Sequence, residues 1–122
     1  MEDDPLTREI IGAAIEVHRF FGPGLLESIY EKALAHELRL RRVPVACQQP
    51  VPVRYKGETL DDFRLDLLVS AEVVVELKVA DALLPIHTAQ LLTYLKLTGL
   101  KRGLLINFKV ERLTDGIKRV SL

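Results

Sequence analysis

The sequence predicts an α/β protein, because the spacing of its apolar residues changes along the chain. In the first third they recur every three or four residues, as on one face of a helix. After Pro44 they alternate with polar residues, as in strands. Helical spacing returns over residues 85–97, and an apolar run follows at residues 103–108. We therefore expect a sheet flanked by helices.

The composition limits what the protein can be. The chain has 122 residues, 48% of them hydrophobic, so we expect one domain over residues 1–122. Its 17 basic and 17 acidic residues give no net charge, which excludes the strongly cationic composition of a protein that coats nucleic acid. The apolar runs are too short to span a membrane. With the acidic N-terminus Met1 to Asp4, this predicts a cytoplasmic protein.

Two helices are predicted before the strands. Asp4 can cap the first helix, Pro5 suits its first turn, and Gly22 ends it. The second helix covers residues 26–41, and the proline at position 44 stops it.

Three strands are predicted in the middle of the chain. Residues 51–55 and 63–69 alternate in polarity, with a turn at residues 56–57 between them. Residues 70–72 form a second turn, which leads into a strand over residues 73–79. Short turns join antiparallel neighbours, so we expect these strands to be antiparallel.

A helix and two strands complete the prediction. The helix begins at Pro85 and ends at Gly99, and residues 103–108 form a buried strand. Residues 114–120 are also predicted as a strand. The single cysteine, Cys47, has no partner for a disulfide or a metal site, so we expect an ordinary half-buried strand residue there.

Charged residues interrupt the central strands at one place. Glu76 and Lys78 are two residues apart, so they share one face of their strand, and Leu77 lies on the other. The two leucines that flank Asp66 should join Leu77 on the apolar face, which puts Asp66 on the polar face. A hairpin centred on Ala71 then pairs Asp66 with Glu76.

Two opposed carboxylates repel each other unless a cation lies between them. Oxygen ligands without nearby cysteine or clustered histidine suit Mg²⁺ or Mn²⁺ better than zinc. The ammonium group of Lys78 could hold a hydroxide or a scissile phosphate, as metal-assisted phosphodiester hydrolysis requires. The alternative is a surface salt-bridge ladder of Asp66, Glu76 and Lys78 without a metal.

Polar residues on two helices could contribute to such a site. His87, Gln90 and Tyr94 are spaced by three and four residues, so they form one stripe of the helix that begins at Pro85. The amide and the hydroxyl could orient a phosphate or the lysine, whereas for His87 alone a capping role is the alternative. Glu27 falls in the first turn of its helix, where an acid usually only stabilises the helix dipole.

Several motifs together match a known family. Through these motifs the chain resembles the bacterial GxxExxY protein family, which is grouped with the PD-(D/E)XK nuclease superfamily. The resemblance extends from about residue 7 to residue 120. The matching residues, in chain order, are Gly24, Glu27 and Tyr30, then Asp66, Glu76-Leu77-Lys78, His87, Gln90 and Tyr94, and Gly103 to Phe108.

The resemblance implies a fold and an activity. The fold is a restriction-endonuclease-like α/β core with a mixed sheet of about four to five strands flanked by helices. The activity is that of a magnesium-dependent nuclease, with DNA as the favoured substrate. Carried over by position, the site residues are the metal ligands Asp66, Glu76 and the Leu77 carbonyl, the catalytic lysine Lys78, the helix acid Glu27, and the accessory pair Gln90 and Tyr94.

The chain's partners follow from its charges and its size. Residues 96–122 carry seven basic and two acidic residues, which fits a basic rim for nucleic acid or a solvated tail. A small nuclease usually needs help to grip a duplex, so we expect a homodimer or a partner protein, through residues 100–102 or the edge of the tail strand. The expected nucleic-acid contacts are His87, Lys96, Lys101 and Arg102.

Two other functions stay open at this point. One is a nucleic-acid or protein binding module that keeps the nuclease-like fold without catalysis. The other is a purely structural charged face of the sheet.

Overall fold

The computed structural model describes residues 4–122. Its elements are α1 (Pro5–Phe21), α2 (Glu27–Leu40), β1 (Val45–Tyr55), β2 (Glu58–Val69), β3 (Val73–Lys78), α3 (Pro85–Thr98), β4 (Arg102–Asn107), the 3₁₀ helix η1 (Leu113–Gly116) and β5 (Ile117–Ser121). Within residues 4–122, none of the helices combines the length and the apolar character needed to cross a bilayer. Residues 1–3, part of the acidic N-terminus behind the predicted cytoplasmic location, lie outside the described residues.

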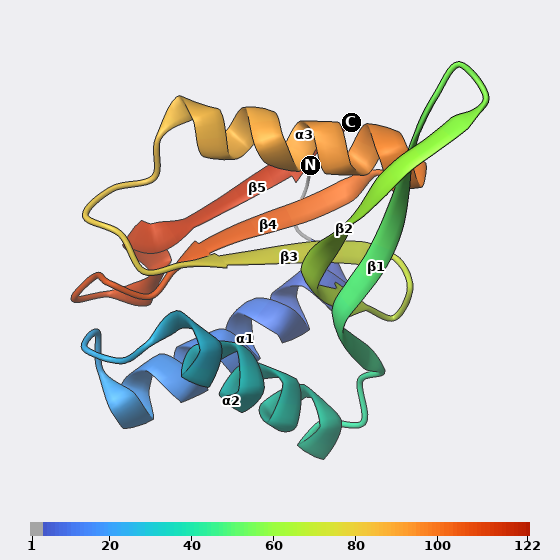
Figure 1. Cartoon of the computed structure of the whole chain (residues 1–122). Helices are drawn as coiled ribbons and strands as arrows, with labels where there is room; N and C mark the ends of the chain where they lie inside the picture. The colour runs from blue at the N-terminus through green and yellow to red at the C-terminus, as the bar shows by residue number, and fades with distance from the viewer. Residues whose placement is uncertain (1–3) are drawn as a thin grey trace.

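The five strands form one mixed sheet, in the order in which they occur in the sequence. The pairs β1–β2, β2–β3 and β4–β5 are antiparallel, whereas β3 and β4 are parallel and are connected through α3. Figure 1 shows α3 on one face of the sheet and α1 with α2 on the other. This is the predicted restriction-endonuclease-like α/β fold, with five strands and three flanking helices in the described part of the chain.

The predicted helix ends are confirmed. Asp4 caps α1 by accepting a hydrogen bond from the Thr7 backbone N–H at 2.9 Å, and the Thr7 hydroxyl accepts one from the Asp4 N–H at 3.4 Å. Gly22 follows α1 with a φ of 74°, and Gly99 follows α3 with a φ of 76°. Glycine adopts these positive φ angles at little cost, which is why the helices end there.

Three details differ from the prediction. The strands β1 and β2 both begin earlier than the alternation indicated. Leu113–Gly116 forms a 3₁₀ helix, so the last strand begins only at Ile117. Gly116 packs so closely on β4 that a Cβ atom there would lie 2.3 Å from the carbonyl oxygen of Asn107. Cys47 lies in a strand as expected, but its side chain is exposed rather than half-buried.

Each face of the sheet has its own apolar core. Leu67 and Leu77 pack with α1 and α2 in the larger core. Leu65 and Val74 pack with α3 in the smaller core on the other face. The predicted division of β3 into a buried face and a polar face is therefore wrong, because α3 covers much of the second face.

The strand β2 changes face between its two buried leucines. Leu65 and Leu67 lie in different cores, so the prediction that they share one face is wrong. The pairing of β2 is interrupted between them on both sides. Gln48 of β1 has a φ of 52° and no ladder partner in the described register, and the β3 ladder ends at the pair Leu67–Val75. An interrupted ladder allows the strong local twist that rotates the side chains.

Candidate active site

Asp66 and Glu76 meet where β2 separates from β3. The register through Leu67 and Val75 brings these two residues opposite each other, in agreement with the predicted hairpin. Side chains here replace the backbone ladder. The Asp66 N–H donates to Glu76 Oε1 at 3.2 Å, and the Leu77 N–H donates to Asp66 Oδ2 at 2.9 Å. Each carboxylate thus holds the backbone of the other strand, so their positions depend on each other.

The Glu76 side chain lies in an environment that disfavours its charge. It is only 7% exposed. Burial, and then the negative charge of Asp66, raise the pKa of Glu76 to about 8, while the charge of Lys78 opposes this shift. The two carboxylates can therefore both be charged only if a positive charge lies near them, at the point where the strands part.

Glu27 and Lys78 lie next to this pair. Lys78 is the last residue of β3, and its positive charge acts to lower the pKa of Glu27 and of Glu76. Glu27 is the first residue of α2, and its carboxylate accepts a hydrogen bond from the Val79 N–H. Partial desolvation and the charge of Asp66 raise the pKa of Glu27. Three elements, α2, β2 and β3, thus bring four predicted site residues together.

The position of Glu27 depends on a buried tyrosine. Tyr30 is 0% exposed and stacks on Phe108, with 4.4 Å between the ring centroids. Its hydroxyl donates to the Gly22 carbonyl oxygen and accepts from the Leu25 N–H at 3.1 Å. Tyr30 therefore fixes the loop from which α2 begins, and with it the place of Glu27.

The end of β3 is held from its other side by Asn107, which is 2% exposed. Its amide group donates to the Ala80 carbonyl oxygen at 2.8 Å and accepts from the N–H groups of Ala80 and Lys109, both at 3.1 Å. The Phe108 N–H donates to the Lys78 carbonyl oxygen at 3.0 Å. The backbone that carries Lys78 is thus tied to the end of β4.

Two residues at the site were missed in the sequence. Glu31 lies one turn after Glu27 on α2, and its carboxylate accepts a hydrogen bond from the Gln48 side chain at 2.6 Å. Burial, and then the charges of Asp66 and Glu27, raise the pKa of Glu31. The spacing of four residues between two glutamates on one helix was the available signal. No sequence signal marked Gln48.

The three predicted residues of α3 differ in their surroundings. Tyr94 stacks on Phe63, with ring centroids 4.4 Å apart. Burial, and then the charges of Glu76 and Asp66, raise the pKa of Tyr94, so its hydroxyl feels both carboxylates. Gln90 is exposed, one turn earlier on the same helix. His87 Nδ1 accepts a hydrogen bond from the backbone N–H that precedes the helix, at 3.0 Å, which is the capping role left open above.

The predicted basic contacts Lys96, Lys101 and Arg102 lie between the last turn of α3 and the start of β4. Arg102 is beside the first residue of β3, whereas Lys78 is the last residue of that strand. Arg102 also forms ion pairs with two acidic side chains, at 3.0 and 3.6 Å. Lys96 is in the last turn of α3, close in sequence to the other two. Arg102 and its neighbour Lys101 therefore lie at the opposite end of β3 from Lys78.

The donor set at this site fits a hard cation. The Leu77 N–H points to Asp66, and the carbonyl of a strand residue points to the same side as its N–H. Two carboxylates and this carbonyl suit Mg²⁺ or Mn²⁺, and Mg²⁺ needs only one or two carboxylates because it keeps several waters. Within residues 4–122, no three side chains of the His, Cys, Asp or Glu type are arranged to enclose an ion. The residues fit a partly hydrated ion rather than an all-protein cage.

These features define a class of protein: a restriction-endonuclease-like α/β fold with an aspartate, a glutamate and a lysine gathered on its central hairpin. The chain belongs to the PD-(D/E)XK nuclease superfamily, whose family model matches residues 4–120. No curated protein matches the chain. No solved structure matches it either.

Proposed function

We propose that the chain is a metal-dependent nuclease of the GxxExxY family, folded as one domain over residues 1–122, which hydrolyses phosphodiester bonds in DNA. One observation carries the proposal: Asp66 and Glu76 meet beside Lys78 where β2 leaves β3. Membership of the PD-(D/E)XK nuclease superfamily supports the nuclease activity. The metal and the substrate are our proposal.

The central residues would divide the chemistry among them. Asp66, Glu76 and the Leu77 carbonyl would hold Mg²⁺ or Mn²⁺. The bound ion would lower the pKa of a water molecule and neutralise charge that develops on the phosphate. Lys78 would hold the attacking oxygen by a hydrogen bond from its ammonium group. Its backbone, tied to β4, would keep the start of the lysine side chain at a fixed place beside the two carboxylates.

The helices would supply the supporting groups. Glu27, at the start of α2, would accept a hydrogen bond from a water in the shell of the ion. The Tyr94 hydroxyl, which feels the charge of both carboxylates, would orient the phosphate or Lys78. Gln90 would do the same from the preceding turn of α3.

A cleavage assay with matched variants tests the proposal. Linear, single-stranded and circular DNA and an RNA of the same sequence are incubated with the chain and Mg²⁺. Asp66→Asn weakens the metal site and Lys78→Met removes the donor to the attacking oxygen. We expect each to lose at least about 100-fold in rate, the usual cost of removing one preorganised electrostatic group. The control is Asp62→Asn, which alters an exposed carboxylate of the same strand. Equal rates in all three variants and the unchanged protein would reject the mechanism.

One observation favours a second candidate, the non-catalytic binding module. The carboxylates of Asp66 and Glu76 already accept backbone hydrogen bonds, and residues 4–122 contain no enclosed three-ligand site. Calorimetry separates the two candidates. Magnesium binding that disappears in Glu76→Gln favours the nuclease. Salt-dependent DNA binding without magnesium uptake favours the module.

We also propose that the chain acts as a homodimer or with a partner protein. The strand β5 lies at one edge of the sheet, and its outer side has no neighbouring strand in residues 4–122. An open edge of this kind can pair with a second chain. Light scattering that gives only the monomer mass at micromolar concentration would contradict self-association.

A further inference from the structure

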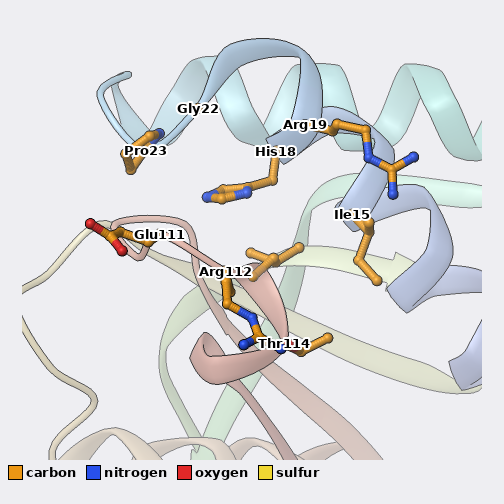
Figure 2. A pocket seen from close by; sticks show the side chains of 9 residues that line it. Ile15, His18, Arg19, Gly22, Pro23, Glu111, Arg112 and Thr114 are labelled. Atoms are coloured by element: carbon orange, nitrogen blue, oxygen red, sulfur yellow. The ribbon is translucent and has the colours of Figure 1, made fainter.

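A cavity of about 480 Å³ lies between the end of α1 and the segment that joins β4 to η1. Figure 2 shows the His18 ring between the loop at Gly22 and Pro23 and the segment that carries Glu111 and Arg112. The volume of the cavity falls in the range of small-ligand sites, roughly 300–1,000 Å³. The residues that line it differ from those of the candidate active site, so it requires its own explanation.

His18 is the buried polar group of this cavity, with 7% of its surface exposed. Its Nε2 lies 2.7 Å from the carbonyl oxygen of Val110. A carbonyl oxygen only accepts, so Nε2 carries the hydrogen, and Nδ1 is left as a lone pair or, in the protonated ring, as a second N–H donor. Every buried side-chain nitrogen and oxygen in residues 4–122 has a partner. The structure gives this ring one hydrogen bond, through Nε2, so Nδ1 is not fully enclosed by protein atoms, and the ring lines the cavity.

The cavity has an excess of positive charge. Arg19 and Arg112 line it, against the single carboxylate of Glu111. In Figure 2 the Glu111 carboxylate and the Arg19 guanidinium lie at opposite ends of the view. Both arginines are exposed, so each can turn its planar group toward a ligand. A guanidinium group binds phosphate oxygens in pairs of parallel hydrogen bonds.

We propose that this cavity binds a phosphate group through His18, Arg19 and Arg112. The buried imidazole supplies a fixed donor when it is protonated, and the two guanidinium groups supply the remaining charge. The phosphate comes either from the backbone of a nucleic-acid strand or from a free phosphate compound. The cavity lies beyond the end of β4, which runs parallel to β3 and ends next to Lys78. The proposal does not depend on the nuclease activity.

A titration with inorganic phosphate, followed by NMR, tests the site itself. We expect the His18 ring nitrogens to shift on binding. His18→Gln keeps a donor to the Val110 carbonyl and removes Nδ1, and Arg112→Gln removes one guanidinium. Each variant should weaken phosphate binding about tenfold, the loss expected for one charge-assisted hydrogen bond. Lys118→Gln, an exposed position that lines a different cavity beside α3, is the control and should bind as the unchanged chain does.

Two outcomes of this titration overturn the proposal. One is a His18 resonance that phosphate leaves unmoved. The other is equal phosphate affinity in His18→Gln, Arg112→Gln and Lys118→Gln. Asp66→Asn should keep the phosphate affinity, so a failed nuclease assay and a failed phosphate site are distinguishable.

A competition experiment separates the two sources of phosphate. The probe is a short single-stranded oligonucleotide without terminal phosphates. If it shifts the His18 resonance and binds Arg112→Gln more weakly, the cavity takes a backbone phosphate. If inorganic phosphate binds there and the oligonucleotide does not compete, the cavity takes a free phosphate compound. Either result supports the site. An oligonucleotide that displaces phosphate equally well from the unchanged chain and from every variant contradicts it.

Discussion

The two edges of β3 are built differently. On the side of β4, pairing continues through all six residues of the strand. On the side of β2, three pairs form and the ladder then ends at Leu67 and Val75. Beyond that point the carboxylates of Asp66 and Glu76 accept hydrogen bonds from backbone N–H groups of the opposite strand. One edge of the strand therefore stabilises the sheet, and the other exposes groups that can do chemistry.

The largest expected effect tests the regular edge. Leu104 of β4 is 0% exposed and lies opposite Val75. Leu104→Ala should lower the free energy of unfolding by about 2–5 kcal/mol, because it leaves a cavity in a packed core. Urea denaturation measures the change, and Leu60→Ala, at an exposed position of β2, is the control. A loss no larger than the control's would mean that this edge does not carry the stability.

The next effect tests the irregular edge through pH. The pKa of Glu76 is raised from 4.5 to about 8 in the folded chain. Between these values the folded state binds more protons than the unfolded state, so stability should fall as pH rises, by at most about 1.4 kcal/mol per pH unit. Denaturation at several pH values with a chelator measures the slope, and added magnesium should reduce it. Glu76→Gln should remove the part of the slope that the Glu76 carboxyl causes. An unchanged slope would contradict the raised pKa of Glu76.

A smaller effect is expected where the two edges meet. Asn107→Asp keeps the shape of the side chain but loses the donor to the Ala80 carbonyl oxygen. Leaving that carbonyl opposite an oxygen should lower the free energy of unfolding by about 1–3 kcal/mol. If the nuclease proposal is correct, kcat should fall with little change in KM, because Lys78 loses its fixed position. Unaltered kcat in a destabilised variant would limit Asn107 to a role in stability.

Much of the fold could be predicted because it depends on local preferences. The cap at Asp4 and the end of α3 at Gly99 follow from single residue types. The turn at residues 56–57 has two positive φ angles, which its glycine favours. The opposition of Asp66 and Glu76 follows from the position of the turn centred on Ala71. Each of these features is decided within a few residues of the chain.

The missed features depend on contacts that are distant in sequence. The change of face in β2 requires interrupted pairing with β1 and β3 together, and no local pattern records it. The second core requires α3 to cover the face that Glu76 shares. The His18 cavity depends on a contact with a residue 92 positions away. Glu31 is different, because its spacing from Glu27 was visible in the sequence.

The smallest expected effect concerns Tyr30, which links the two edges of β3. Its ring stacks on Phe108, just after β4, and its hydroxyl holds the loop that precedes Glu27. Tyr30→Phe keeps the stack and removes the two hydrogen bonds of the hydroxyl, so the free energy of unfolding should fall by about 1–2 kcal/mol. Tyr55→Phe, at an exposed position, is the control.

The cleavage rate decides what the Tyr30 hydroxyl does beyond stability. If it places Glu27 against the end of β3, Tyr30→Phe should slow cleavage well below its temperature of half unfolding, where nearly all of the chain is still folded. It should slow cleavage no further in a Glu27→Gln background, because two changes that act through the same group are not additive. Additive losses in the double variant would show that the tyrosine acts on the site by another route. Since the loop at Gly22 also borders the His18 cavity, the same variant shows whether phosphate binding there depends on this loop.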